Sequence, residues 1–148
     1  MRIIKVKSST GIKVIKELNY KYKFEINRDY EVLLKDNNTE IYELTDKKRI
    51  IGFSGLIHND WNEILQVLNI FIDPEFRNKG YGKYIINFLI NKAKRMDNYR
   101  CIIAEAPAKD YIYKFYAKLG FRKCGYNDRY YTNENNGDIA IFMSYDLE

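Results

Sequence analysis

The segment from Glu63 to Gly82 reads EILQVLNIFIDPEFRNKGYG and decides the fold. Residues 63–72 carry apolar side chains on both faces of an extended chain, which predicts a central strand covered on both sides. Asp73-Pro74 ends this strand, because proline has no N–H to donate to the ladder. A polar loop with two glycines follows, and the spacing of apolar residues predicts a long helix over 81–96. The segment therefore predicts a strand, a glycine loop and a helix in that order.

The elements predicted downstream place a parallel pair of strands in the sheet. Residues 100–106 are expected to form an apolar strand, and residues 108–119 a second helix. The helix over 81–96 is a crossover connection, so the strands at 63–72 and 100–106 should run parallel. The other predicted elements are a strand at 2–7, a helix opening at Thr10-Gly11, a short helix at 28–35, a hairpin of 41–44 and 50–57, and a final strand pair at 121–131 and 138–147.

Length and composition favour one α/β domain spanning residues 1–148. A chain of 148 residues corresponds to a single domain, and 46% hydrophobic with 30% charged residues is ordinary for a globular protein. The net charge of +5 favours anionic partners such as a nucleotide, a nucleic acid or an anionic surface. The positive charges are dispersed, however, whereas a dedicated nucleic-acid binder shows a denser basic stripe.

Cysteine and histidine usage argues against several kinds of site. Cys101 lies in an apolar run and is expected to be buried, and with Cys124 it makes no disulfide framework. His58 is the only histidine and no CxxC pair occurs, so a His/Cys metal site is not expected. His58 itself is expected to be exposed at a hairpin tip, 58–60. The N-terminus lacks a signal-peptide core and no apolar stretch of about 18 residues occurs, so we expect a cytoplasmic protein without a membrane segment.

The loop Arg77-Asn78-Lys79-Gly80-Tyr81-Gly82 has the features of an anion-binding turn. A helix N-terminus leaves about four backbone N–H groups unpaired, and the peptide dipoles add roughly half a positive charge there. Gly80 and Gly82 lack a Cβ, so phosphate oxygens can approach the backbone closely. A diphosphate suits this loop, although a tight strand-to-helix turn with solvated charges explains the same pattern. The dinucleotide fingerprint GxGxxG and the P-loop GxxxxGK[ST] do not occur in the sequence.

Two segments resemble the GNAT N-acetyltransferase family. Residues 70–82, IFIDPEFRNKGYG, are similar to its acetyl-CoA-binding motif, an apolar strand and a proline loop followed by Arg/Gln-x-x-Gly-x-Gly/Ala. Residues 115–121, FYAKLGF, resemble the FYxKLGF segment of the family, at a fitting distance along the chain. The resemblance covers residues 63–125, and residues 1–40 carry no recognisable match. It implies an α/β fold with a mostly antiparallel sheet, a splayed parallel pair and flanking helices, with its motif-bearing core at about 50–147.

The resemblance implies how acetyl-CoA would be held. Backbone groups of Ile70, Phe71 and Ile72 would pair with the pantetheine arm where the two parallel strands splay apart. An exposed N–H near Ile70 would polarise the thioester carbonyl, and the amides of residues 78–83 would hold the diphosphate.

Two further positions complete the implied acetyl-CoA site. Lys109 stands where the family often has an asparagine that contacts CoA, so that contact would differ here. Tyr113 is a candidate for stacking near the CoA. The expected binding residues are therefore Ile70, Phe71, Ile72, Arg77, Asn78, Lys79, Gly80, Tyr81, Gly82, Lys83, Lys109 and Tyr113, with no metal.

Tyr116 matches the family's tyrosine that donates a proton to the departing CoA thiolate. A thiol pKa of about 8.5 and a phenol pKa of about 10 are close enough for transfer. The general base stays open between Glu105, Glu63 and a chain of water molecules. Family members often place a carboxylate within the central strand, where this chain has Gln66 and Asn69. Glu105 is the first candidate, because its place at the end of a strand favours partial desolvation.

These features predict an N-acetyltransferase that transfers an acetyl group from acetyl-CoA to a small-molecule or peptide amine by direct attack. Two alternatives remain, a non-catalytic acyl-CoA-binding regulatory module and a nucleic-acid-binding domain, of which the second leaves both motifs unexplained. No nucleic-acid or membrane partner is expected, and a homodimer is an expectation from the family. Acceptor contacts are expected from the first 60 residues and from the loop near 126–137, which carries Tyr126, Tyr130, Tyr131, Glu134 and Asp138.

Overall fold

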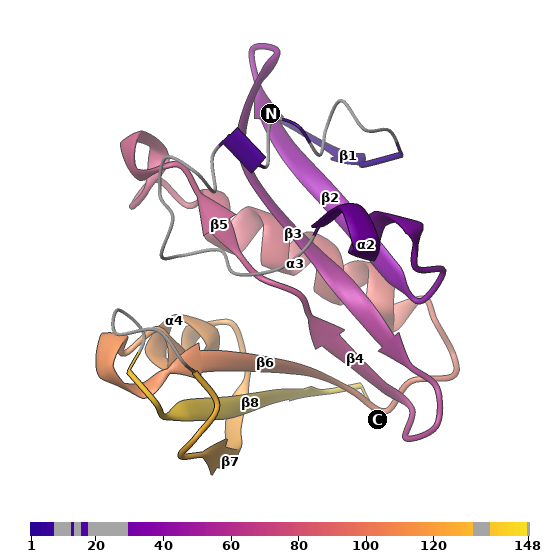
Figure 1. Cartoon of the computed structure of the whole chain (residues 1–148), viewed down its shortest axis with the longest axis vertical. Helices are drawn as coiled ribbons and strands as arrows, with labels where there is room; N and C mark the ends of the chain where they lie inside the picture. The colour runs from indigo at the N-terminus through magenta and orange to yellow at the C-terminus, as the bar shows by residue number, and fades with distance from the viewer. Residues whose placement is uncertain (8–12, 14–15, 18–29, 132–136, 148) are drawn as a thin grey trace.

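The computed structural model describes residues 1–7, 13, 16–17, 30–131 and 137–147, which form one sheet of eight strands with flanking helices (Figure 1). The helix predicted to open at Thr10-Gly11 and the start of the one predicted at 28–35 lie outside these residues. The strands are β1 (Arg2–Lys5), β2 (Thr39–Asp46), β3 (Arg49–Asn59), β4 (Ile64–Val67), β5 (Phe71–Ile72), β6 (Cys101–Pro107), β7 (Arg122–Asn127) and β8 (Ala140–Asp146). The helices are α2 (Tyr30–Lys35), α3 (Tyr81–Lys94) and α4 (Tyr113–Lys118), with short 3-10 turns η1 (Pro74–Phe76) and η2 (Ala108–Asp110).

The sheet is mixed, as the sequence predicts. Its order is β1-β2-β3-β4-β6-β8-β7, and β5 pairs with β3 beyond the end of β4. β4 and β6 run parallel, whereas the other neighbouring strands run antiparallel. The crossover helix between β4 and β6 is α3, so the predicted parallel pair is confirmed.

The strand predicted at 63–72 is not continuous, and that prediction is wrong in an informative way. Val67 lies opposite Leu56 of β3, and Phe71 lies opposite Phe53. Two residues of β3 therefore face three residues of the β4–β5 segment, which is the one-residue excess of a β-bulge. The Leu68 amide donates to the Gly55 carbonyl at 2.9 Å inside this bulge. The extra residue bends the chain, so β5 runs in a different direction from β4.

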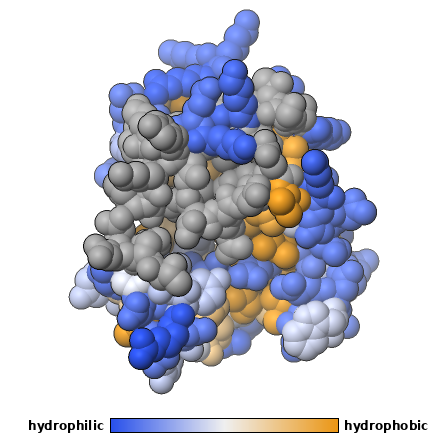
Figure 2. Space-filling view, in the orientation of Figure 1, coloured by the Kyte–Doolittle hydropathy of each residue, from blue (hydrophilic) through white to orange (hydrophobic). Residues whose placement is uncertain are grey.

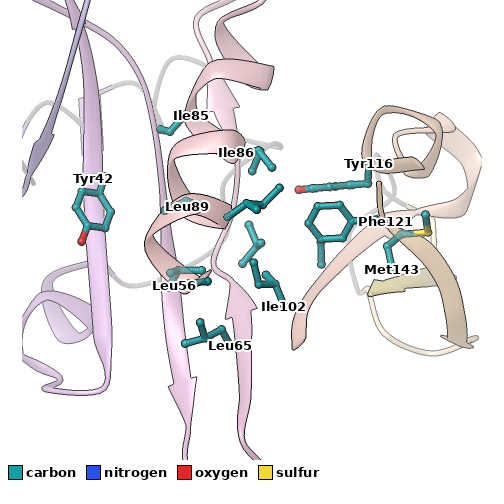
Figure 3. Packing of buried hydrophobic residues seen from close by; sticks show 14 of the residues in the cluster. Tyr42, Leu56, Leu65, Ile85, Ile86, Leu89, Ile102, Tyr116, Phe121 and Met143 are labelled. Atoms are coloured by element: carbon teal, nitrogen blue, oxygen red, sulfur yellow. The ribbon is translucent and has the colours of Figure 1, made fainter. Parts of the chain in front are cut away.

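Helix α3 forms because its apolar residues recur on one face. Its buried side chains are Ile85, Ile86, Leu89, Ile90 and Ala93, and they pack on one side of the sheet (Figure 3). Gly80 caps the start with φ 86°, a left-handed backbone conformation that glycine adopts without steric cost. Basic residues occupy the last turn, where they complement the helix dipole.

Helix α4 is shorter than the predicted span of 108–119. Ala108–Asp110 forms the 3-10 turn η2, and Tyr111 takes φ 56°, which a continuing α-helix does not allow. The helix proper therefore starts at Tyr113 and places Tyr116 two residues before its end.

Two hydrophobic clusters cover the two faces of the sheet. The larger lies between the sheet and helices α3 and α4 (Figure 3). The smaller is formed by Val6, Ile41, Phe53, Leu68 and Phe71, against which Leu33 and Leu34 of α2 pack. Full burial of one such side chain contributes roughly 1.5–3 kcal/mol relative to exposure. Both sides of β3 and of the β4–β5 segment are thus buried, as their apolar sequences predict.

Two sequence predictions about polar side chains need correction. His58 is not exposed at a hairpin tip, because β3 continues to Asn59 and pairs with β4 as far as Ile64. Its imidazole is half-buried and lies 2.7 Å from the Tyr99 hydroxyl and 3.2 Å from the Glu40 carboxylate. Cys101 is half-buried rather than buried, because it starts β6 on the face away from the larger cluster.

Along the described ranges, no helix is long and apolar enough to cross a membrane. Among the same residues, no three His, Cys, Asp or Glu side chains gather into a group that would hold a metal ion.

Candidate active site

The parallel strands β4 and β6 separate after a short shared ladder. Their pairing runs from Ile64 and Cys101 to Gln66 and Ile103. Beyond this point β6 continues beside β8 as far as Pro107, whereas β5 pairs with β3 (Figure 1). Among the described residues, no strand pairs with the β4-side edge of β6 from Ala104 onward. The resulting fork leaves room for an extended arm to add its own hydrogen bonds.

The direction of the backbone groups at the fork follows from the β3–β5 ladder. The Asp73 amide donates to the Ile51 carbonyl at 2.8 Å, so the alternation of an antiparallel pair turns the amide and carbonyl of Phe71 toward β3 as well. By the same alternation, the backbone groups of Ile72 point away from β3, toward the fork. Phe71 thus turns its backbone toward β3, and the pairing of Ile70, Phe71 and Ile72 with a pantetheine arm stays a prediction.

Asp73 anchors the loop that follows β5. Its side chain is 1% exposed; Oδ1 accepts the Glu75 amide at 3.1 Å and Oδ2 accepts a guanidinium hydrogen bond from Arg49 at 3.1 Å. The sequence alone assigns Asp73 only the role of ending a strand. The buried carboxylate caps η1 and ties the loop to β3, which fixes the start of α3 relative to the fork.

Arg77 folds back onto the strand instead of extending toward the helix N-terminus. Its Nε donates to the Ile72 carbonyl at 2.7 Å, and its guanidinium lies 5.7 Å from the centre of the Phe71 ring. Of the two backbone groups that Ile72 turns toward the fork, the carbonyl is thus bound by Arg77. Among the described residues, the Ile72 amide is left for a ligand. Lys79 lies over the Phe76 ring, and Lys83 is exposed at the start of α3.

The N-terminus of α3 has the geometry of a diphosphate site. Within the described chain, the first helix amide with a protein acceptor is that of Tyr84, which donates to the Gly80 carbonyl at 3.0 Å; the amides of residues 78–83 have none, and no side chain caps the helix. Asn78 and Gly80 have φ values of 61° and 86°, which turn successive amides outward. A Cβ built on Gly80 meets no atom within 4 Å, so the space beside these amides is open. The residues present therefore fit a bound diphosphate.

Gly82 joins this helix end to the fork. A Cβ placed there would lie 3.3 Å from the Phe115 ring and 3.6 Å from Ile70 Cδ1. The absence of a side chain thus lets α3, α4 and the bulged strand meet at one point. Gly82 is therefore needed for close packing, whereas Gly80 is needed for the left-handed backbone conformation of the turn.

The fork divides the sheet into two halves, β1 to β5 and β6 to β8. Tyr116 projects from α4 into the space between these halves, with its oxygen directed toward Ile86 of α3 (Figure 3). The residue is 3% exposed, and its ring packs edge-on against Phe115 and Phe121. In the part of the chain that the structure describes, its hydroxyl has no hydrogen-bond partner. Burial, followed by the nearby charges of Glu105 and Tyr131, raises the pKa of Tyr116 well above its ordinary value of about 10. The phenol therefore stays protonated and can act as a donor.

Glu105 lies on the opposite face of β6 from this cluster. Ile102, Ala104 and Ala106 alternate with it and are buried, whereas Glu105 is half-buried. The Gln66 amide donates to Glu105 Oε2 at 3.0 Å, and the two side chains thereby bridge β4 and β6 at the end of their ladder. Sequence reasoning missed this contact, because it predicted the parallel direction of the two strands but not their register. Glu63, the alternative base, is 61% exposed and lies 3.9 Å from the Arg100 guanidinium at the far end of β4.

The remaining predicted residues lie around α4. Lys109 is exposed in η2 and runs past Gly137, where an added Cβ would lie 3.7 Å from Lys109 Cδ. Tyr113 is half-buried beneath Lys123 Nζ, 4.5 Å from its ring centre, and contacts Tyr111. Of the predicted acceptor loop, Glu134 lies outside the described residues.

Tyr126 is not part of the same surface as Tyr130. It lies opposite Ile141 of β8, on the α4 face, and is 72% exposed. Tyr130 instead contacts Phe142 on the other face, where Glu105 lies. Tyr126 and Tyr130 thus lie on opposite faces of the sheet, because strand alternation separates them.

The fold and the site define an α/β protein with a forked parallel pair beside a helix N-terminus that fits a diphosphate. Residues 37–123 match the family model described as an acetyltransferase (GNAT) domain. Among curated proteins, none matches the chain by sequence.

Solved structures of the same fold include three from different organisms. A chimera of the spermidine N-acetyltransferase SpeG from Vibrio cholerae and hSSAT superposes with a TM-score of 0.84 at 17% identity, covering 99% of this chain and 97% of the other. The smu.2055 protein from Streptococcus mutans UA159 gives 0.80 at 20% identity with both chains fully covered. Arabidopsis thaliana NAA60 in complex with a bisubstrate analogue gives 0.81 at 13% identity, with 98% of each chain covered.

Because the family model spans more than half of the sequence, the chain belongs to the GNAT acetyltransferase family. It is an acetyltransferase of the class that transfers acetyl groups to amines. The fold predicted from residues 63–125 is confirmed, and enzymes of this family generally use acetyl-CoA as the donor.

Proposed function

We propose that this chain transfers an acetyl group from acetyl-CoA to a primary amine that attacks the thioester directly. The observation that carries the proposal is the fork after Gln66 and Ile103, placed beside the acceptor-free amides of residues 78–83. An arm that lies in the fork and a diphosphate that lies at the α3 N-terminus belong to one molecule of the CoA type. The backbone amides of Ile70 and Ile72 would hold its arm, and the Ile70 amide would lie nearest the reacting carbonyl.

Acetyl-CoA supplies an activated thioester, in which a C–N bond to the amine forms as the C–S bond breaks and CoA leaves as a thiol. Glu105 would accept the proton that the attacking amine loses. Tyr116 would donate its phenol proton to the departing sulfur, and exchange with solvent would restore both groups. The products are then the N-acetyl amine and free CoA.

The placement of Glu105 and Tyr116 on opposite faces of β6 supports this division of roles. Glu105 faces away from α3 and α4, whereas Tyr116 lies among them. An amine arriving from the face of β6 away from α3 and α4 would meet the base, and the thiol would leave toward the helices. The raised pKa of Tyr116 keeps the phenol protonated at neutral pH.

Three broader expectations stay part of this proposal. Residues 1–148 would act as a single acetyltransferase domain, since one sheet runs through the described chain from β1 to β8. The homodimer and the cytoplasmic location remain predictions from the sequence.

A thermal-shift titration followed by a thiol-release assay tests the proposal. Acetyl-CoA at 100 times its dissociation constant should add about 2.7 kcal/mol to the stability. A panel of amines should then release free thiol only in the presence of both substrates. The absence of any shift with acetyl-CoA or CoA would overturn the proposal. A shift without thiol release from any amine would favour the non-catalytic acyl-CoA-binding module.

A further inference from the structure

Aromatic side chains flank Glu105 on the face of the sheet away from α3 and α4. Phe142 of β8 lies directly opposite Glu105, so both side chains share this face. The Tyr130 ring meets Phe142 edge-on with centroids 5.5 Å apart, and the Tyr131 ring meets Tyr130 at 4.9 Å. We call Tyr130, Tyr131 and Phe142 the aromatic wall. Figure 2 shows hydrophobic atoms on the lower part of this face, among hydrophilic ones.

The backbone fixes the aromatic wall close to the reacting groups. The amides of Tyr130 and Tyr131 both donate to the Asp138 carbonyl, at 3.0 and 3.1 Å, which folds this segment back beside the start of β8. Tyr131 also lies near enough to Tyr116 for its charge to contribute to the raised pKa of that phenol. The wall therefore shares the face of β6 and β8 on which Glu105 lies.

The charges on these strands suit an acceptor with one positive group. β4, β6, β7 and β8 carry two carboxylates, Glu105 and Asp146. Asp146 is engaged by the Arg122 guanidinium at 2.9 and 3.3 Å and by the Ser144 hydroxyl at 2.8 Å. Glu105 is thus the carboxylate that these strands direct to the reaction point. The net charge of +5 also works against approach of a polycation.

We propose that the acceptor is a monoamine with an aromatic or other flat apolar body, which packs on the aromatic wall while its amino group meets Glu105. This inference rests on the proposed function and names its substrate class. Aromatic pairs contribute about 0.5–1.5 kcal/mol beyond the area that they bury. A polyamine would need further carboxylates for its other ammonium groups, and the second carboxylate of these strands, Asp146, is already bound by Arg122. The proposed class therefore differs from the spermidine named for several proteins of the same fold.

The test compares acceptors on the full chain at saturating acetyl-CoA. The thiol-release assay gives kcat/KM for 2-phenylethylamine, n-butylamine and spermidine. We expect 2-phenylethylamine to exceed both others by at least about 10-fold, the discrimination that an apolar pocket provides. Phe142→Ala should remove most of that preference, and KM for acetyl-CoA should not change.

Two further variants keep the result interpretable. Phe142→Leu preserves apolar volume if Phe142→Ala does not fold, and it should lower the aryl preference while leaving acetyl-CoA binding intact. Tyr126→Ala removes an exposed aromatic from the opposite face of the neighbouring strand and should change neither preference nor rate. A preference for spermidine that Phe142→Leu leaves unaltered would overturn the inference while acetyl transfer stands. No thermal shift with acetyl-CoA and no thiol release would instead overturn the proposed function, and this inference with it.

Discussion

Tyr116 combines burial with a hydroxyl that has no protein partner in the described chain. Its hydroxyl oxygen is not one of the fully buried polar atoms without a partner, which belong to Thr39, Tyr42, Ser54 and Asn62 in the described chain, so water or a ligand can reach it. The resemblance to the GNAT motif identifies Tyr116 from the sequence alone. Its surroundings were not foreseeable, because the charges of Glu105 and Tyr131 reach it from segments that are distant along the chain.

Replacing Tyr116 with phenylalanine should separate catalysis from binding. The variant loses the proton donor but keeps the ring packing against Phe115 and Phe121, so we expect kcat to fall by about 10²–10⁴. The acetyl-CoA thermal shift should be retained. Wild-type kcat in this variant would rule out Tyr116 as the acid.

Gln66 is expected to act as a positioning residue through Glu105. Gln66→Met keeps a similar volume and removes the amide that donates to Glu105 at 3.0 Å. We expect kcat to fall by about 10-fold, equivalent to one charge-assisted hydrogen bond, with KM for acetyl-CoA unchanged. A double-mutant cycle with Glu105→Gln provides the control, because the effect of Gln66→Met should vanish in that background. Additive effects would show that Gln66 acts independently of Glu105.

At the scale of elements, the loop between β5 and α3 depends on a clamp that the sequence does not reveal. Asp73 reads as a strand-ending residue before proline, yet its buried carboxylate joins η1 to Arg49 of β3. The elements themselves were predictable, because periodicity and the proline and glycine signals are local. The bulge and the clamp were not, because both arise from pairing with β3.

Asp73→Ala should weaken both stability and donor binding. It removes a cap worth about 1 kcal/mol and leaves Arg49 with Glu75 alone, so the loop before α3 loosens and KM for acetyl-CoA rises. Glu75→Ala is the matched control, since this carboxylate is 66% exposed and exposed ion pairs contribute about 0–1 kcal/mol. Denaturant unfolding and acetyl-CoA titration of both variants give the comparison. Equal effects in the two variants would contradict the role of the buried clamp.

A polar network ties β2 and β3 to α3 and makes stability depend on pH. The Glu40 carboxylate lies 3.2 Å from His58 and 3.7 Å from Lys92 of α3. Burial opposes ionisation of Glu40, but the His58 hydrogen bond and the charges of Lys92 and Lys5 prevail and lower its pKa below the ordinary 4.5. The ionised group therefore contributes stability above that pH, and the contribution is lost as the pH falls through the lowered pKa.

Unfolding of Glu40→Gln at pH 7 and at pH 3 tests this contribution. The variant should be less stable than the wild type at pH 7, by roughly 1–3 kcal/mol for a lost hydrogen bond to a charged group, and the difference should shrink at pH 3. Glu43→Gln on the same strand is the control with the opposite sign. Burial raises the pKa of Glu43, so neutralising it should cost nothing at pH 7. A difference for Glu40→Gln that does not vary with pH would contradict the network.

At the scale of the whole molecule, the sequence predicts the elements of each half of the sheet but not the contacts that join the two halves. The glycine loop and the FYAKLGF segment lie in different halves of the sheet, and their resemblance to one family places both beside one ligand. The joint between the halves consists of a short β4–β6 ladder, the Gln66–Glu105 contact and the core under α3 and α4. Strand separation at this joint results from a one-residue bulge, which no local pattern in EILQVLNIFI signals.

Because the proposed donor would contact both halves, its binding should stabilise them together. The loop at 78–83 and Ile72 belong to one half, whereas Tyr116 and the β6 residues from Ala104 onward, beyond the β4–β6 ladder, belong to the other. Hydrogen exchange with and without acetyl-CoA should show slower exchange in residues 78–83 and also in 103–106, by up to about 100-fold at 100 times the dissociation constant. The β1–β2 ladder at the distant edge serves as an internal reference and should gain less. Protection confined to the α3 loop would mean that the ligand rests on one half only, and the fork would then have no part in holding the thioester.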